Sequence, residues 1–375
     1  MVVAYHFVAY DRGTVKPWGM AAPQAFPVLH GPASYGWLGV ELFFVISGFV
    51  ICMSAWGRTL GGFARSRIVR LYPAYWVAIV LTTVVLTLWP RVRQPVGLSD
   101  TLLNLTMLQE PLGARSVDAV YWTLWAEARF YLLFAIVVWR GLTYRRALMF
   151  CYGWLLAAAI AAGADQPLLT LVLQPAYAPY FVAGVGYFLI HRFGSNLAVW
   201  AVVAVSLLMA QAQVIVAFRH VTRDVLHRSL PVAPALLVVV AIFAVMAAVA
   251  LGLLSWIRWR WLTVAGILTY PLYLLHEYIG WTMIAALHSL MPRHVTLAVV
   301  IAVMLIGAWL VHRLFERPLA RLLNRHLQRP LPGSGPGLAP GQRPGGPGLA
   351  PVQELPGGAV PAAVRLPGGP GAGAV

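Results

Sequence analysis

The sequence holds few charged residues, and very few of some kinds. Only 10% of its 375 residues are charged, 11 of them are acidic, and Lys16 is the single lysine among 27 basic residues. Soluble domains carry about 25% charged residues, so this composition excludes a soluble globular protein. Its two cysteines, Cys52 and Cys151, both lie in apolar runs. A disulfide scaffold is therefore excluded, and no metal site is predicted.

Apolar residues make up 60% of the chain and fall into long runs. A helix of about 20 apolar residues crosses the hydrocarbon core of a bilayer. Counted with a window of about 19 residues, the runs lie near 1–10, 36–56, 72–89, 119–139, 146–163, 168–191, 195–217, 231–255, 262–287 and 294–313. We therefore predict an all-α polytopic membrane protein, a bundle of about ten transmembrane helices with a truncated first span.

The net charge of +16 comes mainly from arginines between the apolar runs. In a soluble protein such a charge would indicate nucleic-acid binding, but these arginines are placed as the positive-inside rule and anionic lipid require. The segments on one side of the predicted bundle hold 15 basic residues, and those on the other side hold 9. We expect a multi-pass protein of a bacterial-type plasma (inner) membrane, with both termini cytoplasmic, in contact with lipid and not with nucleic acid.

The composition changes towards the C-terminus. Residues 1–325 form the predicted transmembrane domain, whereas residues 326–375 are rich in proline and glycine. Such a composition neither holds a helix nor builds a core, so we expect a disordered cytoplasmic tail. In the segment 57–71, four arginines alternate with apolar residues. This pattern is typical of a basic amphipathic helix that lies along the cytoplasmic interface.

Ionisable side chains inside apolar runs are costly, so each is a functional candidate. His6 is either a structural imidazole or a general base. Glu127 and Arg129 point to different faces of one helix, so each needs a partner on another helix. A structural pair and a catalytic carboxylate are both open for Glu127. His276 and Glu277 follow a proline within a run, and this pattern is more typical of residues at a helix end.

Two further pairs of residues have an ordinary and a functional interpretation. Ser47 and Gly48 are small residues in a bulky helix, which indicates either close helix packing or a passage for a ligand chain. Arg67 and Arg70 are three residues apart and share a helix face. They either face lipid or bind phosphate, whose oxygens match the guanidinium fork.

Together, the strings around these residues resemble the membrane-bound acyltransferase 3 family. The similar strings are AYHF around His6, GVELFFVISGF (39–49), FARSRIVRLYPAYW (63–76), YWTLWAEARFY (121–131), LTYPLYLLHEY (268–278) and FERP (315–318). The resemblance implies a ten-span bundle that moves an acyl group, usually acetyl, from acyl-coenzyme A to a sugar hydroxyl. Family members carry an arginine ahead of the histidine, and the matching position in this chain would lie before Met1. We therefore expect translation to start upstream.

The resemblance also implies roles for individual residues. It makes His6 the essential histidine, Arg67 and Arg70 the paired arginines, and Glu127 the acidic residue of a Trp-rich motif. The predicted catalytic residues are therefore His6 and Glu127. The predicted cofactor-binding residues are Arg67, Arg70, Ser47 and Gly48.

The resulting hypothesis is an acyl-CoA-dependent O-acyltransferase, with acetyl-CoA as the favoured donor and a carbohydrate or glycosylated acceptor. The phosphates of coenzyme A bind the two arginines, the pantetheine arm passes Ser47 and Gly48, and Glu127 orients His6, which acts as the base. An acyl-histidine intermediate is an alternative route. A proton-coupled transporter and a non-catalytic remnant are the alternative functions.

Overall fold

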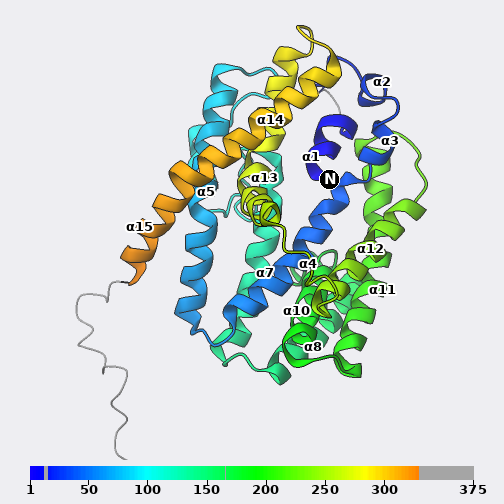
Figure 1. Ribbon diagram of the computed structural model, residues 1–375, viewed down its shortest axis with the longest axis vertical. Helices are drawn as coiled ribbons and strands as arrows, with labels where there is room; N and C mark the ends of the chain where they lie inside the picture. Colours follow the sequence, from blue (N-terminus) through cyan, green and yellow to red (C-terminus); the bar gives the residue numbers. More distant parts are fainter. Residues whose placement is uncertain (12–15, 165, 329–375) are drawn as a thin grey trace, which may run out of the picture. The chain divides into compact units, whose positions relative to one another are not determined.

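The computed structural model describes residues 1–11, 16–164 and 166–328, and the regular structure within these ranges is entirely helical (Figure 1). The predicted tail lies outside the described residues from residue 329 onward. The elements, with η marking 3-10 and π turns, are α1 Val2–Ala4, η1 Tyr5–Ala9, α2 Ala22–Ala25, α3 His30–Ala33, η2 Gly36–Leu38, α4 Gly39–Ala55, α5 Leu60–Leu88, α6 Leu98–Asn104, η3 Ala119–Tyr121, α7 Trp122–Trp139, α8 Tyr144–Ala164, α9 Pro167–Leu173, α10 Ala178–Phe193, α11 Leu197–His220, η4 Val221–Val225, α12 Ala233–Ala250, α13 Arg260–Leu287, α14 Arg293–Val311, η5 His312–Glu316 and α15 Arg317–Gln328.

Within the described residues, eight helical stretches are long and apolar enough to cross a bilayer, which confirms the all-α polytopic membrane fold. They are His30–Ala55, Leu60–Leu88, Ala119–Trp139, Tyr144–Ala164, Pro167–Phe193, Leu197–Asp224, Ala233–Ala250 and Arg293–Leu327. Two of the ten predicted runs are not among them. The run 1–10 forms the short elements α1 and η1, and the run 262–287 forms α13, which is 28 residues long but carries a buried His and Glu.

Two elements differ from the sequence predictions. The predicted interfacial helix over 57–71 is wrong, because most of that segment is the first part of the spanning helix α5. Phe63 and Leu71 are buried in the bundle, and the Thr59 hydroxyl caps the helix by accepting from the Gly62 N–H at 3.2 Å. The run 168–191 is not one regular helix, since Gln174 adopts a left-handed conformation between α9 and α10.

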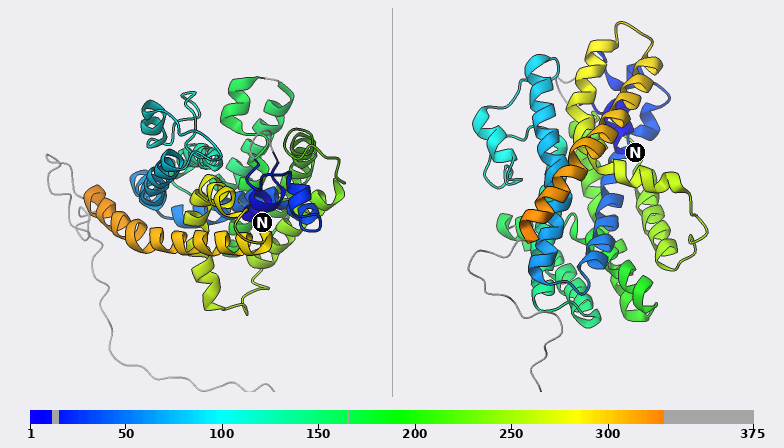
Figure 2. Two further views of the ribbon diagram at one scale, coloured as in Figure 1. Left: turned by 90° about the horizontal axis from the view of Figure 1, so that it is seen from above. Right: turned by 60° about the vertical axis from the view of Figure 1, so that its left-hand side comes forward.

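The last helices form one long rod along a side of the bundle (Figure 2). Helix α14 continues through the π-turn η5 into α15, and α15 packs against α5. A π-turn inserts one extra residue per turn and so rotates the following side chains to a new face. The turn η5 thereby directs the buried side chain of Glu316 towards α5.

Helix α4 runs obliquely through the middle of the view in Figure 1 and packs closely along α10. The two backbones approach most closely at Gly48 and Gly184. A Cβ atom on Gly48 would overlap the carbonyl oxygen of Phe181, and one on Gly184 would overlap that of Val45. Small residues permit such crossings in membranes. The predicted pantetheine passage beside Gly48 is therefore corrected to a helix contact, because the backbone of α10 fills that space.

Replacing Gly48 with alanine tests this assignment. We expect Gly48→Ala to lower the free energy of unfolding by about 2–3 kcal/mol, the cost of overpacking a tight contact. The matched control is Gly153→Ala on α8, where a Cβ atom meets nothing within 4 Å, so stability stays level or rises slightly. Thermal unfolding in detergent gives the comparison. A Gly48→Ala variant that melts like the wild type but binds acyl-CoA poorly would support the predicted pantetheine passage instead.

Candidate active site

His6 lies in the π-turn η1, and its backbone is held from two sides. The wider hydrogen-bond spacing of a π-turn leaves carbonyl groups available for other donors. Two tryptophan indoles fill this role: Trp281 Nε1 donates to the His6 carbonyl at 2.8 Å, and Trp18 Nε1 donates to the Phe7 carbonyl at 2.8 Å. The backbone of His6 is thereby fixed to α13 and to the loop before α2.

The partner of the His6 ring is His276 of α13. The His6 Nδ1 atom lies 2.8 Å from His276 Nε2, and the two rings stack with their centroids 5.0 Å apart. His276 Nδ1 in turn lies 2.8 Å from the backbone oxygen of Tyr273. The interpretation of His276 as a helix-end residue is wrong, because this side chain is fully buried within α13.

These contacts define where each imidazole carries its proton. A carbonyl oxygen only accepts hydrogen bonds, so the contact with Tyr273 places the His276 proton on Nδ1. In a neutral ring Nε2 is then the acceptor, so His6 must donate from Nδ1. The Nε2 atom of His6 therefore keeps its lone pair. His6 as a whole residue is partly buried.

Tyr273 is itself anchored to the start of α7. Its hydroxyl donates to the carbonyl of Val120 at 3.1 Å and lies 3.0 Å from Thr123 Oγ1. Its ring stacks on Phe43 of α4, with the centroids 6.4 Å apart. The carbonyl that holds His276 thus belongs to a residue that contacts two other helices.

The partner of the Glu277 carboxyl group is another carboxyl group. Glu277 is 2% exposed and forms a hydrogen bond with Asp118, which lies just before η3 and is fully buried. The Asp118 carboxyl also accepts the backbone N–H of Tyr278 at 3.2 Å. Burial raises the pKa of Asp118, and a hydrogen bond between two carboxyl groups requires a proton on one of them. This pair ties the loop before α7 to α13, behind the two histidines.

Glu127 and Arg129 each have a partner on another helix, as their different faces require. Ser47 Oγ of α4 donates to Glu127 Oε1 at 2.7 Å, and both side chains are buried. Arg129 donates to a backbone carbonyl of α9 at 2.6 Å. Glu127 therefore joins α7 to α4. The hypothesis gave Glu127 the task of orienting His6, but in the structure His276 holds that ring.

Arg67 points towards neutral groups at the arginine-rich end of the bundle. Its guanidinium donates to Ser54 Oγ at 3.1 Å and to Ser66 Oγ at 3.2 Å. It also lies over the rings of Phe63 and Tyr131, 6.0 and 5.8 Å from their centroids. Among the described residues no carboxylate forms a salt bridge with Arg67. The Glu127 carboxyl interacts electrostatically with Arg67 from α7, so an anion bound at Arg67 would compete with this group.

Arg70 is paired with a carboxylate that the sequence analysis did not single out. Its Nη1 atom lies 2.8 Å from Glu316 Oε1, and His312 Nδ1 lies 2.9 Å from Glu316 Oε2. Glu316 belongs to the FERP string, and its position among arginines was the available signal. Phosphate binding by Arg67 and Arg70 stays a prediction, but at Arg70 a phosphate must compete with Glu316.

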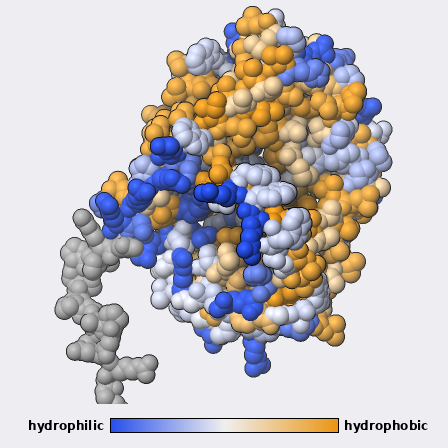
Figure 3. Space-filling model, viewed as in Figure 1, coloured by the Kyte–Doolittle hydropathy of each residue, from blue (hydrophilic) through white to orange (hydrophobic). Residues whose placement is uncertain are grey.

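A basic cavity of about 580 Å³ lies beside the first turns of α5. Arg58 and Arg65 line it together with the hydroxyl groups of Thr59 and Ser66, and Asn324 of α15 completes the wall. Hydrophilic side chains gather over α15 on the face shown in Figure 3, whereas apolar side chains cover much of the remainder. Two guanidinium groups beside two hydroxyls form a suitable environment for phosphate oxygens.

The fold and the site together define a helical membrane protein with a pair of hydrogen-bonded histidines among its helices. Sequence comparison gives its family: the family described as "Acyltransferase domain" matches residues 1–313. The chain therefore belongs to this family, as the resemblance predicted.

A more specific relative matches only part of the chain. Acyltransferase MdmB of Streptomyces mycarofaciens is 30% identical over 135 residues, which cover 33% of this chain and 34% of the relative. The chain thus spans about a third of that relative's length. No solved structure matches the chain.

Proposed function

We propose that this protein is an acyl-CoA-dependent O-acyltransferase that moves an acetyl group to a hydroxyl of a carbohydrate or glycosylated acceptor. The observation that carries the proposal is the lone pair on His6 Nε2, because a base at such an atom activates a hydroxyl nucleophile. Membership of the family supports transfer of an acyl group. The basic cavity supports coenzyme A as the carrier of that group.

In this proposal His6 accepts one proton from the acceptor and later gives it to the leaving thiolate. The acceptor hydroxyl gives its proton to His6 Nε2 while its oxygen attacks the thioester carbon. The C–S bond then breaks as the tetrahedral intermediate collapses, and the thiolate takes the proton from His6. Between these steps the imidazolium is stabilised by its Nδ1–H bond to His276, which is held by Tyr273. The reaction thus neither consumes nor releases a net proton.

The donor is proposed to bind at the arginine-rich end, which the positive-inside rule places in the cytoplasm of a bacterial-type inner membrane. Arg58 and Arg65 hold the phosphate groups in the basic cavity, and Arg67 adds its charge nearby. Arg70 contributes less, because Glu316 already accepts from it.

Replacing Arg58 and Arg65 together with alanine is expected to raise KM for acetyl-CoA by at least about tenfold with little change in kcat. Hydrogen bonds to charged groups contribute about 1.5–3 kcal/mol each, and 1.4 kcal/mol corresponds to about a tenfold change in affinity. The control is Arg115→Ala, since Arg115 pairs with Asp100 and does not line the cavity. Initial rates of labelled acetyl transfer provide both constants. Equal KM values in the two variants would place the phosphates elsewhere.

The function itself is tested with membranes that contain the protein and acetyl-CoA labelled in the acetyl group. We expect label to enter carbohydrate-containing material and to stop doing so in a His6→Ala variant. Proton-coupled uptake of a substrate into vesicles, without consumption of acetyl-CoA, would instead establish a transporter. If well-folded protein shows neither acetyl transfer nor proton-coupled uptake, the chain is non-catalytic.

A further inference from the structure

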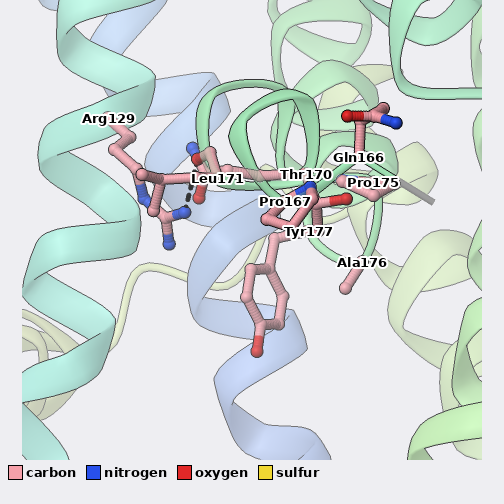
Figure 4. A pocket seen from close by; sticks show the side chains of 9 residues that line it. Arg129, Gln166, Pro167, Thr170, Leu171, Pro175, Ala176 and Tyr177 are labelled. Atoms are coloured by element: carbon pink, nitrogen blue, oxygen red, sulfur yellow. Dashed lines mark hydrogen bonds between the residues drawn. The ribbon is translucent and has the colours of Figure 1, made fainter. Parts of the chain in front are cut away.

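A second cavity lies between α7, α9 and the turn before α10, and the proposed reaction uses none of its residues. Its volume is about 560 Å³, and ligand sites commonly measure about 300–1,000 Å³. Arg129, Thr170, Gln174 and Tyr177 supply polar groups to its lining. Figure 4 shows Arg129 reaching from α7 towards α9, while the ring of Tyr177 extends away from α9 beside α4.

The most unusual of these residues is Gln174. Its side chain is 2% exposed, and neither its Oε1 nor its Nε2 atom has a hydrogen-bond partner among the described residues. The Nε atom of Arg129 is likewise buried without a partner there. Leaving a buried polar group unpaired costs about 1–3 kcal/mol, so such groups in a native protein require an explanation. Both residues line the cavity, so a polar ligand that enters it and reaches these atoms would supply the missing partners.

The charges around the cavity favour a neutral ligand over an anion. The guanidinium of Arg129 interacts electrostatically with Glu110, so its charge is partly balanced. It also donates to the Leu171 carbonyl and lies 5.6 Å from the centroid of the Trp125 ring. The free groups of Gln174 are two N–H donors and one acceptor oxygen. A ligand with neighbouring hydroxyl groups matches this set, because each hydroxyl is both a donor and an acceptor.

The aromatic side of the cavity packs against α4. The Tyr177 ring lies 5.3 Å from Trp122 and 5.2 Å from Phe44 of α4. The preceding residue, Phe43, stacks on Tyr273, the residue whose carbonyl holds the second histidine. The cavity and Tyr273 therefore contact successive residues of α4. In the orientation predicted from the arginines, the cavity lies in the half of the bundle away from the cytoplasm.

We propose that this cavity is a subsite for the acyl acceptor, which binds a neutral, hydroxyl-rich sugar unit between the Gln174 amide and Arg129. The proposal rests on the proposed acyltransferase function, because it assigns the bound sugar to the acceptor. Binding of the sugar itself requires no acyl donor, so binding and transfer are measured separately.

Binding is tested with the full chain in detergent and without acyl-CoA. The probes are the methyl glycosides of glucose, galactose and N-acetylglucosamine, and saturation-transfer NMR measures their affinity. We expect at least one probe to bind, and its Kd to rise at least tenfold in Gln174→Met, which keeps the side-chain size but removes the amide. Arg129→Lys is the second variant, and we expect it to raise the Kd as well. Gln211→Met is the matched control, because this glutamine lies on α11 outside the cavity, and its Kd stays at the wild-type value.

The other outcomes overturn one proposal or the other. Failure of every probe to bind, or equal affinity in Gln174→Met and the wild type, overturns the sugar subsite. Displacement of a bound probe by glycerol 3-phosphate would make the cavity an anion site and also overturns it. Sugar binding that depends on Gln174 in a protein that transfers no acetyl group supports the sugar-binding cavity but rejects both the proposed function and the acceptor assignment. Where transfer occurs, Gln174→Met raises KM for the sugar and leaves KM for acetyl-CoA unchanged.

Discussion

A His6→Ala variant is expected to lose acetyl transfer by a factor of about 10²–10⁴, the usual contribution of a positioned acid or base. The loss should fall on kcat, because the proposed base acts on the reacting hydroxyl while the donor phosphates bind at Arg58 and Arg65. The measurement is the initial rate of labelled acetyl transfer at saturating acetyl-CoA, with the amount of folded protein determined in parallel.

His220→Gln is the matched control for this substitution. Its side chain is 65% exposed, and it pairs with Asp224 in the segment after α11. Full activity in this variant alongside an inactive His6→Ala variant supports a specific base. Full activity in both variants would remove His6 from the reaction and, with it, the proposed mechanism.

Much of the fold follows from the sequence because membrane crossing requires long apolar runs. The runs near 119–139 and 294–313 lie within candidate spans of the structure, and the run near 72–89 does so except for its last residue. The prediction that Glu127 and Arg129 need partners on other helices also rests on simple geometry, since residues two positions apart point in different directions.

The arrangement of the site depends on contacts that local sequence does not encode. His6 and His276 are 270 positions apart, and each alone has an ordinary structural explanation. Gly48 fits both a passage and a helix crossing until the position of Gly184 is known. Gln174 gives no signal at all in the sequence, because its importance comes from a buried amide whose neighbours are brought together by folding.

His276 provides the second large expected effect, because it sets which nitrogen of His6 carries the proton. A His276→Ala variant removes the acceptor for His6 Nδ1–H, so the proton can move to Nε2 and block the base. We expect kcat to fall about 10²-fold or more, as when the residue that orients a catalytic imidazole is lost. The KM for acetyl-CoA should hardly change.

A His276→Gln variant separates this positioning role from simple packing. The glutamine oxygen can accept from His6 Nδ1–H, and the amide N–H can donate to the Tyr273 carbonyl. The expected order of kcat is therefore wild type, then His276→Gln, then His276→Ala. Nitrogen-15 NMR of the His6 ring should show the Nδ1–H form in the first two proteins and a mixture in the third. If His276 only fills space, His276→Leu would match or exceed His276→Gln in kcat, and the proton on His6 would then be placed by another group.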